Sequence, residues 1–122
     1  MSDQVRYDPA KNRIYITFDG FMELERARQL HDAYRDAIGR AKPGFTVLTY
    51  AVDYKPGGPD VQEVVAAMVK MAEDGGCVKV ARVVGDNPLG GMQINRLARE
   101  RTRYESRHVE TEAEAEAYLD GP

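Results

Sequence analysis

Short runs of β-forming residues alternate with longer amphipathic stretches along this 122-residue chain. The first two runs, residues 5–7 and 13–18, flank a stretch of turn-forming residues at 8–12 and predict a hairpin. In the second run apolar and polar residues alternate, as in a strand with one buried face. The later β-forming runs are residues 45–52, 78–84 and 107–110. Together these runs predict five strands.

Amphipathic stretches lie between the later runs. From Glu23 to Arg40 apolar residues recur every three or four positions, which predicts a helix with one buried face. We expect the next helix to start with Asp60 as its N-cap and to end at Gly75. Residues 92–106 predict a third helix that is rich in Arg.

A capping box marks the start of a last helix, because Thr111 is followed three residues later by Glu114. The residues expected to cover the edge of the sheet from this helix are Ala113, Ala117, Tyr118 and Leu119. The complete order is ββαβαβαβα, and strands that alternate with helices imply right-handed crossovers. We therefore predict an α/β fold with a mixed, mostly parallel sheet, an N-terminal β-hairpin and about four helices.

Composition narrows the classes of function. The apolar share of 43% is typical of a globular protein, and the length suits one domain, expected to span residues 1–122. No stretch reaches the roughly 20 apolar residues of a membrane-spanning helix, and the polar start does not resemble a signal peptide. The net charge of −3 argues against nucleic-acid binding, which needs a basic surface. We therefore expect a cytoplasmic protein with no nucleic-acid partner and no membrane span.

The sequence contains no recognisable catalytic pattern. The lone Cys77 precedes an apolar run, so we expect its thiol to be buried rather than reactive. His31 and His108 fall outside the loops where a site is expected, and no serine lies at a strand-to-helix turn. The glycines of 85–91 lack the following Lys and Ser or Thr of a phosphate-binding loop. We therefore expect no cofactor.

The loops after strands two, three and four should meet at the carboxyl edge of the sheet, where open α/β folds bind their ligands. The residues assigned there to ligand or partner binding are Asp19, Phe21, Met22, Asp53, Tyr54, Lys55, Asp60, Asp86 and Asn87. Asp19, Asp53 and Asp86 can together bind a divalent cation. Because Asp after a strand more commonly caps a turn, we expect no metal.

The order of elements resembles the STAS-like fold of anti-sigma-factor antagonists, particularly the divergent SpoIIAA-like group. The segments that carry the resemblance are the hairpin from Tyr7 to Gly20, the strand from Val47 to Asp53, and the closing stretch from Glu112 to Leu119. The resemblance covers nearly the whole chain and implies a single STAS-like domain that binds a protein partner.

In regulatory members of that family a Ser or Thr at the start of the second helix is phosphorylated, and its phosphate disrupts binding to a kinase-like anti-sigma factor. The corresponding segment here, 53–60, contains no Ser or Thr, and Tyr54 carries its only hydroxyl. Asp60 can act there as a fixed negative charge, which is favourable at a helix start. The resemblance therefore implies an interaction module without that phosphorylation switch.

Three functions remain open. The first is a non-enzymatic binding or regulatory module that contacts a protein partner, or a second copy in a homodimer, through the loops at the carboxyl edge. The second is a binder of a small apolar molecule or lipid, held between Phe21, Met22 and the Met-bearing second helix, with Tyr54 and Lys55 as polar tips. The third is an enzyme that acts through Asp53, Tyr54, Lys55 and Asp86.

Overall fold

A computed structural model describes residues 4–52, 54–55, 57–84 and 105–121. Its strands are β1 (Val5–Asp8), β2 (Arg13–Thr17), β3 (Gly20–Phe21), β4 (Thr46–Tyr50), β5 (Tyr54–Lys55), β6 (Lys79–Val83) and β7 (Glu105–Val109). Its helices are α1 (Leu24–Arg40), α2 (Pro59–Asp74) and α4 (Glu112–Asp120). None of these helices combines the length and the apolar character needed to cross a bilayer. The predicted α/β class is confirmed, with three helices in the described part of the chain.

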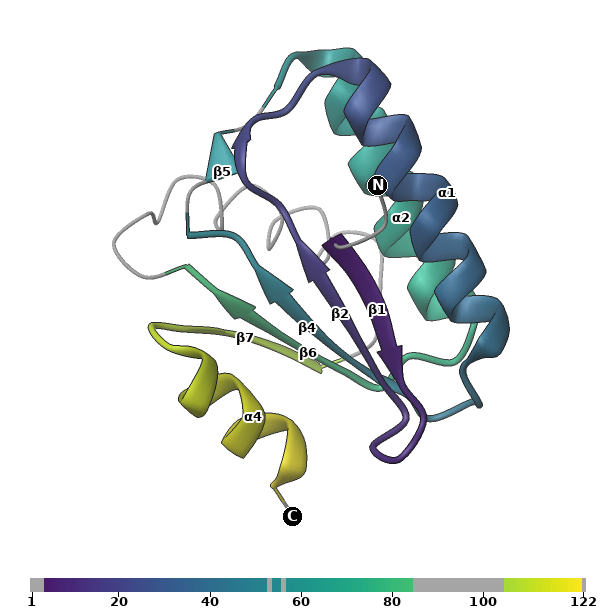
Figure 1. Cartoon of the computed structure of the whole chain (residues 1–122), viewed down its shortest axis with the longest axis vertical. Helices are drawn as coiled ribbons and strands as arrows, with labels where there is room; N and C mark the ends of the chain where they lie inside the picture. Colours follow the sequence, from purple (N-terminus) through teal and green to yellow (C-terminus); the bar gives the residue numbers. More distant parts are fainter. Residues whose placement is uncertain (1–3, 53, 56, 85–104, 122) are drawn as a thin grey trace.

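Five strands form one mixed sheet in the order β1-β2-β4-β6-β7 (Figure 1). β1 runs antiparallel to β2, and all other neighbours are parallel. The hairpin turns at Asn12, whose φ of 52° is a conformation that Asn tolerates better than most residues. The Asn12 side chain also accepts a hydrogen bond from the Tyr7 hydroxyl at 2.7 Å. The prediction of a hairpin leading into a mostly parallel sheet is therefore confirmed.

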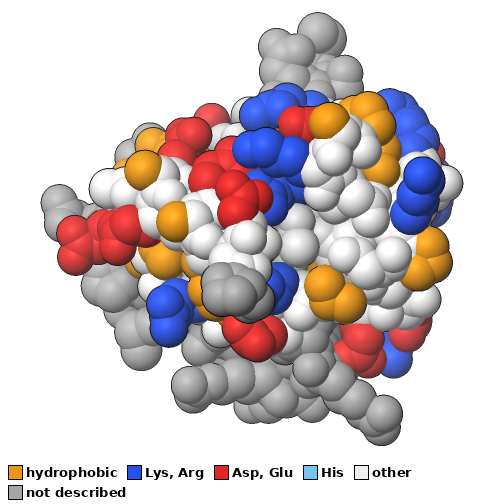
Figure 2. Space-filling view, turned by 90° about the horizontal axis from the view of Figure 1, so that it is seen from below, with side chains coloured by type: hydrophobic (Ala, Val, Ile, Leu, Met, Phe, Trp, Pro, Cys, Tyr) orange, Lys and Arg blue, Asp and Glu red, His pale blue; other side chains and the backbone are white. Residues whose placement is uncertain are grey.

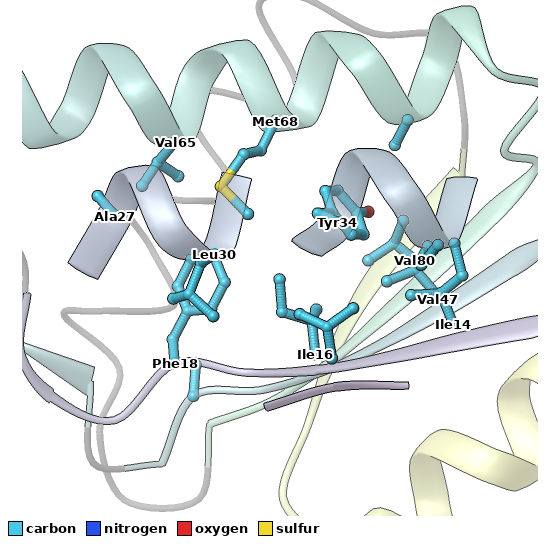
Figure 3. Packing of buried hydrophobic residues seen from close by; sticks show 14 of the residues in the cluster. Ile14, Ile16, Phe18, Ala27, Leu30, Tyr34, Val47, Val65, Met68 and Val80 are labelled. Atoms are coloured by element: carbon cyan, nitrogen blue, oxygen red, sulfur yellow. The ribbon is translucent and has the colours of Figure 1, made fainter. Parts of the chain in front are cut away.

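Helices α1 and α2 lie side by side on one face of the sheet (Figure 1). Their apolar faces meet the strands in the larger of two buried clusters, where Leu30 and Tyr34 of α1 and Met68 of α2 face Ile16 of β2 (Figure 3). The buried residues of α1 are Ala27, Leu30, Tyr34 and Ala37, which follow the three- and four-residue spacing of its sequence. Cys77 joins this cluster, and burial raises the pKa of its thiol to about 12. The prediction of a buried thiol is confirmed.

Helix α4 covers part of the opposite face. Ala115 and Leu119 form a smaller buried cluster with residues of β4, β6 and β7. The guanidinium of Arg13 on β2 is buried and bonds to Glu116 and, at 2.7 Å, to Asp120. Figure 2 views the molecule from below relative to Figure 1 and shows acidic side chains beside basic ones on that surface. Ion pairs therefore hold α4 to the sheet together with the apolar contacts.

The start of α2 differs from the prediction. Gly58 is the N-cap and Pro59 the first residue, so the expectation that Asp60 caps the helix is wrong. The fixed φ of proline suits the first position of a helix, which is why the helix starts one residue earlier. Asp60 lies in the first turn instead, where its Oδ1 accepts a hydrogen bond from the backbone N–H of Val61 at 2.9 Å.

The Arg-rich helix predicted for residues 92–106 extends too far at its carboxyl end, because residues 105 and 106 belong to β7. Glu105 and Ser106 pair with Lys79 and Val80 as the start of β7, because the parallel neighbour β6 supplies backbone partners. Residues 92–104 of that predicted helix lie outside the described residues.

The last helix begins as predicted, and of its four expected covering residues Tyr118 and Leu119 pack against the smaller cluster. The backbone N–H of Glu114 donates to Thr111 Oγ1 at 3.2 Å, so Thr111 is the N-cap. Ala115 and Leu119 are buried, whereas Ala113 and Ala117 are exposed. The helix therefore lies on a face of the sheet rather than along its edge, and this part of the prediction is wrong.

Candidate functional site

A second, two-stranded sheet stands at the carboxyl edge of the main sheet. β3 follows β2 and β5 follows β4, and the two short strands pair in parallel with Gly20 opposite Tyr54 and Phe21 opposite Lys55. The backbone N–H of Met22 donates to the Lys55 carbonyl at 3.3 Å. Because β2 and β4 are already parallel neighbours, their continuations meet without any long connection. The predicted residues after strands two and three are thereby brought together.

Met22 and Tyr54 face the interior from this small sheet. Each is 1% exposed, and the Tyr54 ring lies edge-on to the ring of Phe18 with centroids 5.2 Å apart. Burial raises the pKa of the Tyr54 hydroxyl to about 12. Both residues therefore belong to the core, and neither presents a polar or apolar tip to solvent.

The backbone at Gly57 holds this arrangement together. A Cβ at this position would lie 2.5 Å from the Met22 carbonyl oxygen and 2.9 Å from the Val61 Cβ. Only glycine allows the chain leaving β5 to pass so close to the chain leaving β3. The two loops are thus packed against each other rather than lying as separate surface segments.

Phe21 points away from the core and is 63% exposed. It forms one wall of a groove of about 510 Å³ between the beginning of β1, β3 and the first half of α1. The other lining residues are Gln4, Val5, Glu23, Glu25, Arg26, Gln29, Leu30 and Ala33. We call this hollow the Phe21 groove. It combines an apolar floor with a polar rim, as ligand and peptide sites commonly do.

Asp19 is held in an ion pair beside the Phe21 groove. Arg26 of α1 donates to the Asp19 carboxylate and, at 2.5 Å, to the side-chain oxygen of Gln4. The same guanidinium reaches the Asp19 backbone carbonyl at 3.4 Å. Asp19 therefore fixes the loop between β2 and β3 to α1, and its charge is matched by Arg26.

The remaining predicted residues do not join the Phe21 groove. Asp60 is exposed and lines a second groove of about 440 Å³ between the outer sides of α1 and α2. Asp53, Asp86 and Asn87 lie outside the described residues. Within the described ranges no three His, Cys, Asp or Glu side chains are grouped closely enough to hold a metal ion.

The sequence did not predict the two buried arginines, Arg13 beneath α4 and Arg82 in β6. Arg82 of β6 is 1% exposed and lines a small interior cavity of about 30 Å³ together with Tyr34 and Thr49. The signal was present, because Arg82 lies two positions from the core residue Val80 and so faces the same side of the strand. The cavity has room for about one water molecule and none for an apolar ligand.

The sequence also did not predict the groove residues that α1 contributes. A charged residue in the first turn of a helix is common and carries no signal of binding. In the described part of the chain, the carboxyl edge offers an exposed aromatic ring, an apolar floor and carboxylates. No model of a known protein family matches this chain, and a search among curated proteins finds no significant relative.

Proposed function

We propose that this chain is a non-enzymatic binding module that docks a protein partner in the Phe21 groove. The observation that carries the proposal is the exposure of Phe21, at 63%, on a short strand whose neighbours are fixed in the core. An aromatic side chain displayed on rigid backbone loses little conformational entropy on binding, and such residues dominate the energy of protein interfaces.

A site for a small apolar molecule finds less support. The residues expected to enclose it, Met22 and Tyr54, are packed in the core. The cavity between the helices and the sheet, at about 30 Å³, is far smaller than the few hundred Å³ of typical ligand sites. The Phe21 groove is large but open and rimmed by charge, which favours a macromolecular partner.

The proposal also includes the fold family of the domain, its cellular compartment and its lack of a phosphorylation switch. An N-terminal hairpin, parallel strands β2, β4 and β6, and helices α1 and α2 on one face support a single STAS-like domain. We place its activity in the cytoplasm, and the missing Ser and Thr in segment 53–60 argue for partner binding without a phosphorylation switch.

Site-specific photocrosslinking tests the docking site. Among the described residues, Phe21 and Val78 are large apolar side chains that are exposed, at 63% and 50%, and they serve as test and control positions. A photoreactive phenylalanine analogue at position 21, introduced in the cells that make the protein, should give a discrete crosslinked product. The same analogue at position 78 should give none.

The substitution Phe21→Ala separates binding from folding. If a partner docks on the ring, the crosslinked species recovered with a probe at neighbouring Gln29 should fall about thirtyfold, since central aromatic residues often contribute about 2 kcal/mol or more. Val78→Ala should leave the yield of the crosslinked species unchanged. Equal yields from Phe21→Ala and the unaltered chain would contradict the proposal.

A further inference from the structure

The Phe21 groove has an apolar floor and an unequal distribution of charge along its rim. Val5 and Leu30, which are 8% and 5% exposed, lie at its base, and Phe21 rises beside them. The charged residues that line it are Glu23, Glu25 and Arg26. Which of these charges is available to a partner decides the chemistry that the groove favours.

Arg26 is already engaged. Its guanidinium bonds to the Asp19 carboxylate, to the Asp19 carbonyl and to Gln4, so its positive charge is matched within the chain. A partner's carboxylate would have to compete with Asp19 for this guanidinium. Arg26 therefore adds little attraction for an acidic partner.

Glu23 and Glu25 are both exposed, and neither forms an ion pair with another described residue. Glu23 occupies the N-cap position of α1 but makes no side-chain capping hydrogen bond, so its carboxylate is not used by the helix end. Lys55 lies in register with Phe21 but does not line the groove. With Arg26 matched by Asp19, the rim carries two unmatched negative charges.

We propose that the protein segment docked in the Phe21 groove is basic, an inference that rests on the proposed function. An aliphatic side chain of this segment packs on Val5 and Leu30, and its Lys or Arg side chains lie beside Glu23 and Glu25. A cation placed against the ring of Phe21 gains further attraction from the aromatic face. The charge of the rim thus selects among partners that the apolar floor alone would accept.

Titration of the isotope-labelled full chain with two synthetic heptapeptides tests this inference. One has a central Leu flanked by four Lys and two Ser, and the other has Glu in place of each Lys. The basic peptide should change the amide resonances of Gln4, Val5 and residues 20–33 and bind at least about tenfold more tightly than the acidic peptide. Raising salt from about 50 to 500 mM should weaken it, because exposed charges are screened.

Two double variants with the same change in net charge serve as the test and its control. Glu23→Gln with Glu25→Gln should weaken the basic peptide about three- to thirtyfold, as expected for two exposed ion pairs. Glu110→Gln with Glu112→Gln, at the start of α4 and away from the groove, should leave the affinity unchanged.

Equal binding of the two peptides, resonance changes outside the groove, or equal weakening by the two double variants would overturn the inference. The proposed function fails separately. If crosslinking at position 21 traps a partner while the peptides bind alike, docking stands and the basic character of the segment falls.

Discussion

The two faces of the main sheet bury their side chains by different means. On one face, α1 and α2 together enclose a large apolar cluster whose strand residues include Ile14 and Val47, at 0% and 1% exposure, with the buried Arg82 beside it. On the other, the nine-residue α4 contributes two buried side chains, Ala115 and Leu119. There a buried Arg13 and its carboxylate partners supplement a small apolar contact.

The polar side of this comparison is a connected network. Tyr15 donates to Glu116 at 2.8 Å, and Lys11 lies 3.5 Å from the same carboxylate. Although partial burial opposes it, the hydrogen bond from Tyr15 and the charge of Arg13 lower the pKa of Glu116. The hydrogen bond from Arg13 likewise lowers the pKa of Asp120. The difference teaches that the α1–α2 layer depends mainly on apolar packing, whereas α4 depends partly on the charge state of its carboxylates.

The largest expected effect is in the apolar layer. Ile14→Ala should lower the free energy of unfolding by about 4 kcal/mol, because a fully enclosed cavity cannot relax. Leu119→Ala should cost about 2 kcal/mol, since a short helix on an open face can shift to fill the space. Urea denaturation measures both, and equal losses would remove the distinction between the two faces.

The second prediction concerns pH. Because the folded-state pKa values of Glu116 and Asp120 lie below their unfolded values, their stabilisation is present above about pH 4 and is lost as pH falls through the lowered values. Glu116→Gln with Asp120→Asn should be less stable than the unaltered chain at pH 7, and this deficit should shrink toward pH 3. Denaturation at a series of pH values checks it, and a deficit constant with pH would refute it.

The smallest expected effect concerns the backbone entropy of α1, the helix of the apolar layer. Gly39 lies in α1 with no atom within 4 Å of a Cβ built on it. Gly39→Ala should therefore stabilise the protein by about 0.5–1 kcal/mol, because alanine loses less freedom in a helix. Thermal unfolding should show a higher midpoint. A lower midpoint would mean that this end of α1 is more crowded than its geometry indicates.

Neighbouring residues at the candidate site mark the limit of prediction from sequence. Phe21 and Met22 were assigned to the same site, yet one is 63% exposed and the other 1%. Their exposure depends on the pairing of β3 with β5, which joins residues more than thirty positions apart, as in the pair Gly20 and Tyr54. A two-residue strand has no periodicity of its own, so nothing local distinguishes its inward from its outward side.

The sequence alone determined the features that arise from local chemistry. These are the hairpin at Asn12, the apolar spacing of α1 and α2, the cap at Thr111 and the parallel arrangement that strands separated by helices require. The tertiary structure decided the rest. Arg13 meets Asp120 across 107 positions, Arg82 is enclosed within the core, and the Phe21 groove forms where β1, β3 and α1 converge. Burial, ion pairing and the shape of a groove depend on which distant segments meet, and local propensity does not encode that.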